Sequence, residues 1–247
     1  MSLHKINLQK PLVHCITNYV VANFTANGLL AIGASPVMAD AVEEVEEMAS
    51  ISNALLLNIG TLNEQTIKSM LLAGNSANAS RIPIVFDPVG AGATNFRLKT
   101  TMNLLQQLKI NLIRCNVGEL AAITGVSWRA KGVDSGEGEL DVATTAKHIA
   151  TKYNCLVIVT GEQDVITDGN RLEWITGGHE KITKITGSGC LLSALCAAEL
   201  SSSENAFDDL VNLLCDYKKA SLNAKSAIGS FQINFLNQLE YLAEGHQ

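Results

Sequence analysis

Short apolar or β-branched runs alternate along most of the chain with segments whose apolar residues recur at helical spacing. This alternation is typical of a mainly parallel sheet flanked by helices. Strands are predicted at Leu12–Ile16, Pro36–Ala39, Ala54–Ile59, Ile82–Asp87, Asn111–Cys115 and Cys155–Thr160. We expect a helical segment after each strand, and the fold class is therefore α/β.

Two regions depart from this alternation. The stretch Asp164–Thr176 is predicted to form a hairpin, because residues 168–170 read DGN between apolar runs and supply turn chemistry. From Gly189 onward the pattern is helical, which predicts a helical C-terminal end with segments at Leu191–Leu200, Glu204–Ile228 and Phe231–Leu242.

The domain organisation follows from the scarcity of linker-like sequence. Only Lys131–Gly138 (KGVDSGEG) has such a composition, and it is too short to divide domains. We therefore expect one domain over residues 1–247, with Lys131–Gly138 as a surface loop.

Composition and charge exclude several functional classes. The net charge of −6 leaves no basic surface for nucleic acid. No uninterrupted apolar run approaches the roughly 18 residues of a membrane span. Met1–Lys10 lacks the basic and then apolar segment of a secretory signal, which favours the cytoplasm. A chain that is 47% hydrophobic and 17% charged also favours a subunit interface.

The six cysteines show no spacing typical of a metal site. They include no CxxC pair and no His-rich neighbourhood, which argues against zinc, iron–sulfur clusters and a disulfide framework. Most of them are expected to be buried thiols.

Candidate chemistry lies at the strand ends, because ligands of open α/β sheets gather at the carboxyl ends of the strands. Asp87 ends a predicted strand and precedes a glycine-rich turn. It could hold a metal ion through water or simply cap the turn, and its own segment favours neither. Thr160 also ends a strand and could hydrogen-bond a phosphate, although a threonine before glycine is more often part of a turn.

A second strand end carries Arg114, Asn116 and Glu119. Asn116 and Glu119 fit a helix N-cap and its capping-box partner, which is the structural interpretation. In the functional interpretation Glu119 orders the water molecules of Mg²⁺, and Arg114 meets a phosphate through its fixed fork of donors. The segment alone favours the structural interpretation.

The strongest segment is Thr186–Cys190 (TGSGC), which leads straight into an apolar helix. Gly187 and Gly189 permit a tight bend, and the first helical turn leaves backbone N–H groups unpaired, so the segment predicts an anion-binding hole. Cys190 would lie at its mouth. The helix N-terminus is expected to lower the pKa of this thiol below about 8.5, so that it could accept a proton from a substrate hydroxyl. The alternative is a half-buried structural cysteine.

Common nucleotide-binding motifs do not fit the chain. GSG lacks the third glycine and the following acidic strand of a dinucleotide site, and no GxxxxGK[ST] loop is present.

Taken in order, these segments resemble the hydroxyethylthiazole kinase family of the ribokinase-like fold over nearly the whole chain. The resemblance also rests on Leu12–Asn18 (LVHCITN), Phe24–Met38 (FTANGLLAIGASPVM), Asn58–Leu62 (NIGTL), Asp87–Ala93 (DPVGAGA), Lys131–Ser135 (KGVDS), Ile166–Gly169 (ITDG) and Gly229–Phe231 (GSF). It implies transfer of the ATP γ-phosphoryl group to the hydroxyl of 4-methyl-5-(2-hydroxyethyl)thiazole. The product would supply thiamine phosphate synthesis, and the enzyme would be a homotrimer with sites between its subunits.

The resemblance also implies roles for individual residues. Met38, Gly187 and Asn18 would contact the thiazole, and Arg114, Thr160 and Gly189 would contact ATP. Glu119, Asp87 and Asn116 would organise Mg²⁺, and Cys190 would be the catalytic residue. Because related sugar kinases carry Asp at the position of Cys190, we expect Cys190→Asp to retain activity.

The sequence departs from the family where Cys115–Glu119 reads CNVGE instead of the usual GNASE, and where Ser188 replaces the commoner Thr. The first departure concerns ATP affinity more than the reaction. Two other functions stay open: another ribokinase-like kinase acting on hydroxymethylpyrimidine or a sugar, and a non-catalytic thiazole- or nucleotide-binding protein.

Overall fold

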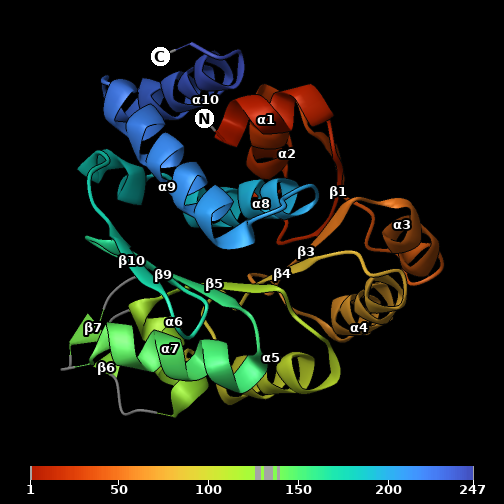
Figure 1. Cartoon of the computed structure of the whole chain (residues 1–247). Helices are drawn as coiled ribbons and strands as arrows, with labels where there is room; N and C mark the ends of the chain where they lie inside the picture. The colour runs from red at the N-terminus through yellow and green to blue at the C-terminus, as the bar shows by residue number, and fades with distance from the viewer. Residues whose placement is uncertain (1, 126–128, 131–135, 138–139, 247) are drawn as a thin grey trace.

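A computed structural model describes residues 2–125, 129–130, 136–137 and 140–246. Its central sheet has eight strands in the order β10-β9-β8-β5-β4-β3-β1-β2, and β6 pairs separately with β7 (Figure 1). The strands are β1 (Leu12–Ile16), β2 (Ser35–Val37), β3 (Ala54–Asn58), β4 (Ile84–Asp87), β5 (Leu112–Asn116), β6 (Arg129–Ala130), β7 (Gly136–Glu137), β8 (Leu156–Thr160), β9 (Asp164–Thr167) and β10 (Leu172–Ile175).

The pairing confirms the predicted fold class. Strands β2, β1, β3, β4, β5 and β8 are mutually parallel, whereas β9 and then β10 continue the sheet beyond β8 as antiparallel strands. The predicted hairpin is therefore confirmed. The expectation that every strand is followed by a helix is wrong for β8, which turns directly into β9.

Helices cover both faces of the sheet (Figure 1). One face carries α1 (Ser2–Gln9), α2 (Ala22–Ala31), α8 (Ser188–Leu200), α9 (Ala206–Asn223) and α10 (Ile228–Ala243). The other carries α3 (Val45–Ile51), α4 (Glu64–Ala79), α5 (Asn95–Gln107), α6 (Val117–Thr124) and α7 (Val142–Tyr153). A 3-10 helix, η1 (Glu180–Lys184), precedes α8. Each face thus has its own apolar core against the strands.

Helix α8 is the helix that positions the site. Every residue from Cys190 to Glu199 is buried, because its small and apolar side chains let β1, β3, β4, α2 and α9 pack around it. Its N-terminus consequently points to the carboxyl ends of the parallel strands. None of the described helices is long and apolar enough to cross a membrane.

Three details differ from the sequence-based expectation. Helix α1 was not predicted; its buried Leu3 and Ile6 join the core beside α8 and α10. The helix expected at Glu204–Ile228 ends at Asn223, and Ile228 begins α10 instead. The surface loop predicted at Lys131–Gly138 lies outside the described residues except for residues 136–137, which belong to β7.

Glu199 lies near the C-terminal end of α8, and its burial leads us to expect that the free energy of unfolding depends on pH. Its side chain is 1% exposed; Oε2 accepts a hydrogen bond from Ser2, and Oε1 has no partner among the described residues. Burial raises the pKa of Glu199 to about 7, and the negative charges of Asp209 and Asp216 add to the shift.

Because the folded pKa lies above the unfolded one, the stabilisation from proton binding is complete at low pH and is lost as the pH rises through 7. Glu199→Gln should therefore raise the free energy of unfolding at pH 8 by about 1–3 kcal/mol and change it little at pH 4.5. Urea unfolding at both pH values measures this, with the exposed Glu204→Gln as control. Equal effects of Glu199→Gln at the two pH values would contradict the assignment.

Candidate active site

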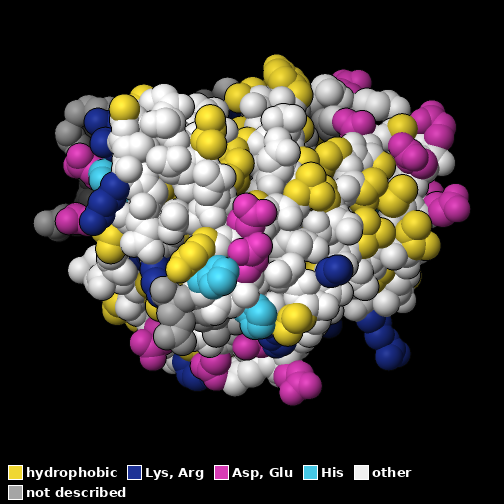
Figure 2. Space-filling view, turned by 90° about the horizontal axis from the view of Figure 1, so that it is seen from above, with side chains coloured by type: hydrophobic (Ala, Val, Ile, Leu, Met, Phe, Trp, Pro, Cys, Tyr) yellow, Lys and Arg dark blue, Asp and Glu magenta, His cyan; other side chains and the backbone are white. Residues whose placement is uncertain are grey.

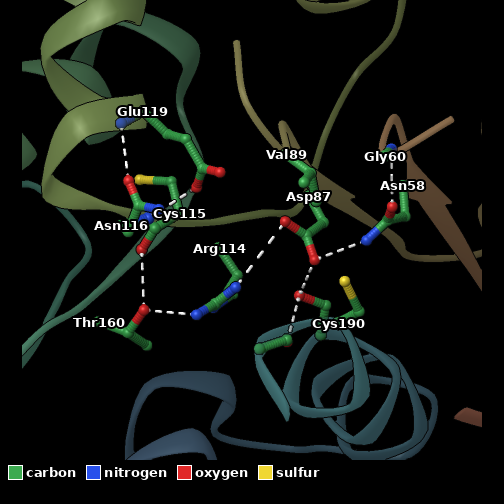
Figure 3. A network of polar contacts seen from close by, with 12 residues as sticks. Asn58, Gly60, Asp87, Val89, Arg114, Cys115, Asn116, Glu119, Thr160 and Cys190 are labelled. Carbon is green, nitrogen blue, oxygen red and sulfur yellow. Dashed lines mark hydrogen bonds and ion pairs between the residues drawn. The ribbon is translucent and has the colours of Figure 1, made fainter. Parts of the chain in front are cut away.

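The sequence-predicted polar residues converge where the carboxyl ends of the strands meet the N-terminus of α8 (Figure 3). By strand register, Asn116 of β5 lies opposite Thr160 of β8, and Asp87 of β4 lies opposite Asn58 at the end of β3, a residue that was not among the predictions. Arg114, on β5, extends its side chain between Thr160 and Asp87.

Asp87 is fully buried at the centre of this group. Its Oδ2 accepts hydrogen bonds from Asn58 Nδ2 and from Ser193 Oγ of α8, each at 2.8 Å. Its Oδ1 lies 3.9 Å from Nη1 of Arg114 and accepts no hydrogen bond in the described structure. Burial raises the pKa of Asp87 above its ordinary value, although Arg114 and the two donors oppose the shift.

Arg114 is the only candidate cation of this group and is 9% exposed. Its Nη2 donates to Thr160 Oγ1, and its Nε has no partner among the described residues. Burial opposes its charge, but the carboxylates of Asp87 and Glu119 raise the pKa of Arg114 above its ordinary value, so it stays charged. The guanidinium thus retains unused donor capacity for an anion.

Glu119 and Asn116 form the predicted capping box of α6. The Asn116 side chain accepts from the Glu119 N–H, and Glu119 Oε2 accepts from the Asn116 N–H, both at 2.8 Å. Glu119 Oε1 also accepts from the N–H of Gly90, at 2.8 Å, and so ties α6 to the loop after β4. Burial and Asp87 raise the pKa of Glu119 to about 7. The structural interpretation of these residues is therefore confirmed, and it leaves each carboxylate oxygen a free lone pair.

The N-terminus of α8 is shaped by two glycines. Gly187 has φ +90°, and a Cβ there would lie 2.5 Å from Val21 Cγ1. A Cβ on Gly189 would lie 2.5 Å from Nη1 of Arg114. The guanidinium therefore rests on the bare backbone of the first helical turn, where the unpaired N–H groups also attract anions.

Cys190 faces this same space from α8 (Figure 3), and its Sγ lies 3.5 Å from Asn18 Nδ2. The expectation of a lowered thiol pKa is wrong: burial raises the pKa of Cys190 to about 12, and the negative charge of Asp87 adds to the shift. Both effects disfavour the thiolate, so the resting side chain is a neutral thiol.

Sequence reasoning missed three residues that organise the site. Asn58 links Asn18 to Asp87, because its Oδ1 accepts from Asn18 Nδ2 at 2.9 Å while its Nδ2 donates to Asp87. Ser193 is the α8 donor to Asp87. Arg97 joins the loops after β3 and β4 by donating to the carbonyls of Ile59, Gly60 and Val89 at 2.6–2.8 Å. For Asn58 and Ser193 the available signal was a polar residue at the end of an apolar run or within one, whereas Arg97 offered no such signal.

Met38 does not join this polar group. It follows β2 at the edge of the sheet and packs, half-buried, against the core on the α8 face. Asn18, in contrast, lies in the loop after β1 and contacts both Asn58 and Cys190.

The carboxylates fit a magnesium ion that is bound mainly through water and phosphate. No group of three or more His, Cys, Asp or Glu residues forms a metal site in the described part of the chain. Mg²⁺ bound with a nucleotide needs only one or two protein carboxylates. Asp87 Oδ1, buried without a hydrogen bond, and the remaining lone pairs of Glu119 meet that requirement.

Comparisons with known proteins agree with this geometry. A model of the hydroxyethylthiazole kinase family matches residues 3–245. The hydroxyethylthiazole kinase of Lysinibacillus sphaericus (strain C3-41) is 56% identical, over 99% of this chain and 97% of its own length.

Solved structures also resemble this chain. That of the hydroxyethylthiazole kinase from Pyrococcus horikoshii OT3 is 38% identical and superposes with a TM-score of 0.86 over 99% of this chain and 93% of its own. A ribokinase-like superfamily protein from Enterococcus faecalis V583 shares the fold at 9% identity, with a TM-score of 0.69 over 94% and 87% of the two chains. The chain therefore has a ribokinase-like fold and belongs to the hydroxyethylthiazole kinase family.

Proposed function

We propose that this chain is a single-domain cytoplasmic kinase that transfers the γ-phosphoryl group of ATP to the hydroxyl of 4-methyl-5-(2-hydroxyethyl)thiazole, in thiamine salvage. The observation that carries the proposal is the guanidinium of Arg114, which rests on the N-terminal turn of α8 between Asp87 and Thr160. In a chain of this family, that arrangement supplies positive charge where a phosphoryl group would be transferred.

Charge neutralisation is the main contribution that we assign to the protein. A phosphoryl group in transfer spreads negative charge over its equatorial oxygens, so fixed donors and cations matter most. Arg114 and the backbone N–H groups at Gly189 and Cys190 would supply the donors, with Thr160 holding the guanidinium in place. Asp87, Glu119 and Asn116 would hold Mg²⁺, which neutralises phosphate charge when bound.

The acceptor alcohol would lie against Cys190. Its thiol is neutral at rest and cannot accept a proton in that state, so it would orient the hydroxyl by a hydrogen bond. The hydroxyl proton would pass to an oxygen of the transferred phosphoryl group as the new P–O bond forms. Gly187 and Asn18 flank Cys190 and would contact the ring. Met38 is a soft side chain suited to a sulfur heterocycle.

We further propose a homotrimer whose sites lie between subunits. Met38 follows β2, the edge strand of the sheet, so a neighbouring copy that packs on this edge would lie against it. Tyr19, Val20 and Leu30 are exposed apolar residues in and before α2. Figure 2 shows hydrophobic side chains gathered over one half of the face seen from above, with acidic side chains along its outer edge. Light scattering of the purified protein would contradict the trimer if it gave a monomer mass.

Phosphorylation of the thiazole alcohol by the purified protein with Mg-ATP, followed by mass spectrometry, tests the function. Hydroxymethylpyrimidine and ribose are the control alcohols. Formation of thiazole monophosphate alone is expected. Phosphorylation of only a control alcohol would show that the enzyme is a kinase of that alcohol instead. Binding of the thiazole without any product would favour a non-catalytic role.

Substitutions of Cys190 are expected to have moderate effects. Because the transition state is largely dissociative, orientation of the hydroxyl by Cys190 contributes less than the anion hole. Cys190→Ala should lower kcat by about 10- to 100-fold, with KM for ATP unchanged, and Cys190→Asp should retain activity. Steady-state kinetics with varied Mg-ATP at saturating thiazole alcohol measure kcat and KM for ATP of both variants. A folded but fully inactive Cys190→Asp enzyme would refute the role, and the exposed Cys215→Ala is the control.

A further inference from the structure

Helix α9 contacts, from outside the site, both segments that we assign to phosphate binding. Tyr217, buried on this helix, donates a hydrogen bond from its hydroxyl to the carbonyl of Ser188 at 2.6 Å. Ser188 is the first residue of α8 and directly precedes Gly189. The ring of Tyr217 is itself held edge-on against Phe235 of α10, with centroids 5.0 Å apart. The hydroxyl is therefore fixed against the start of the anion hole.

The next residue of α9 reaches the other segment. Lys218 Nζ lies 3.0 Å from Asp164 Oδ2, and the two side chains are only 12% and 7% exposed. Asp164 Oδ1 accepts a hydrogen bond from the N–H of Gly161 at 3.1 Å. Gly161 directly follows Thr160, whose hydroxyl accepts from Arg114. Lys218 thus fixes, through Asp164, the turn that carries Thr160.

Both series of contacts, from Tyr217 and from Lys218, end at the guanidinium of Arg114. Gly189 supports Arg114 from the α8 side, and Thr160 holds it from the β8 side. Within the described residues, neither Tyr217 nor Lys218 forms a hydrogen bond with the thiazole-side residues Asn18 or Cys190. We propose that Tyr217 and Lys218 are positioning residues for the nucleotide, which set the place of Arg114 from two sides without touching substrate. This inference rests on the proposed function, in which Arg114 meets ATP.

The expected signature is a loss of affinity for ATP that leaves the thiazole unaffected. Tyr217→Phe removes one hydroxyl and keeps the ring packing, and Lys218→Met removes the charge and keeps the aliphatic stem. Each should raise KM for ATP about tenfold, the usual effect of one fixed hydrogen bond or buried ion pair. KM for the thiazole should stay within about twofold of the parent value.

The chain offers a matched control in Lys219, which is the exposed neighbour of Lys218. Lys219→Met makes the same chemical change without touching Asp164 and should leave both KM values unchanged. Because Lys218→Met leaves a buried Asp164 unpaired, the double variant Asp164→Asn/Lys218→Met is measured beside it. The double variant should recover thermal stability but keep the raised KM for ATP.

Two outcomes overturn the inference. The first is an unchanged KM for ATP in a folded Tyr217→Phe and in the stable double variant. The second is an equal rise of both KM values, which would indicate a general structural role. Direct binding of a non-hydrolysable ATP analogue separates this inference from the proposed function. If the parent protein does not phosphorylate the thiazole, the proposed function is wrong. Weaker binding of the analogue by the variants would still support the role of Tyr217 and Lys218 in positioning Arg114.

Discussion

Replacement of Arg114 by methionine is expected to lower kcat/KM for the thiazole alcohol by about 10²–10³-fold. Methionine fills much of the same volume but supplies neither charge nor donors, so developing phosphate charge beside α8 would go unpaired. Arg114→Lys should recover only part of the activity, because one ammonium group cannot both hold Thr160 and face Asp87 as the fork does. Steady-state kinetics in both substrates measure this loss.

The same substitution should lower stability, because it leaves the buried Asp87 without its cation. Removing one partner of a buried ion pair typically costs about 3–5 kcal/mol. Arg114→Met/Asp87→Asn removes both charges and should recover most of the free energy of unfolding while remaining inactive. Recovery of activity along with stability would show that Arg114 acts only by neutralising Asp87.

Replacement of Gly189 by alanine is expected to lower kcat/KM by about 10²-fold while preserving the fold. The new Cβ would lie 2.5 and 2.7 Å from Nη1 and Nη2 of Arg114, so the guanidinium must move away from α8. A displacement of about 1 Å in a catalytic group suffices for such a loss. Alanine favours the helix more than glycine does, which limits the cost in stability.

Gly229 provides the matched control for this substitution. Like Gly189, it is the second residue of its helix, but a Cβ there would meet no atom within 4 Å. Gly229→Ala should therefore leave kcat/KM unchanged. An active Gly189→Ala enzyme with unaltered KM for ATP would remove Arg114 from the phosphate-binding role.

The sheet could be predicted from sequence because its strands are buried on both faces and read as continuous apolar runs. Helix α1 was not predicted, because the burial of its apolar residues Leu3 and Ile6 depends on tertiary contacts. Without those contacts, the segment has the same pattern as an exposed amphipathic chain terminus. The boundary between α9 and α10 was predicted at the wrong residues for a similar reason. Both flanking segments have a helical period in the sequence, and tertiary packing decides where the first helix ends.

The sequence by itself determined which residue types stand at the strand ends and at the start of α8. Strand order then placed Asp87, Arg114 and Thr160 near the carboxyl ends of neighbouring parallel strands, and the packing of α8 on the sheet brought Cys190 to them. The partners that complete the group, Asn58 and Ser193, were decided by the tertiary structure, because a lone polar residue in an apolar run carries no signal of what it faces.

Protonation was decided by the tertiary structure alone. The local pattern of Cys190, at a helix N-terminus, predicts a lowered pKa, but burial and the nearby Asp87 raise it to about 12. Desolvation and charge–charge energies depend on groups that are distant in sequence, here about a hundred positions apart. Local sequence therefore determines which groups can carry the chemistry, and the packing around them determines the protonation state in which they do so.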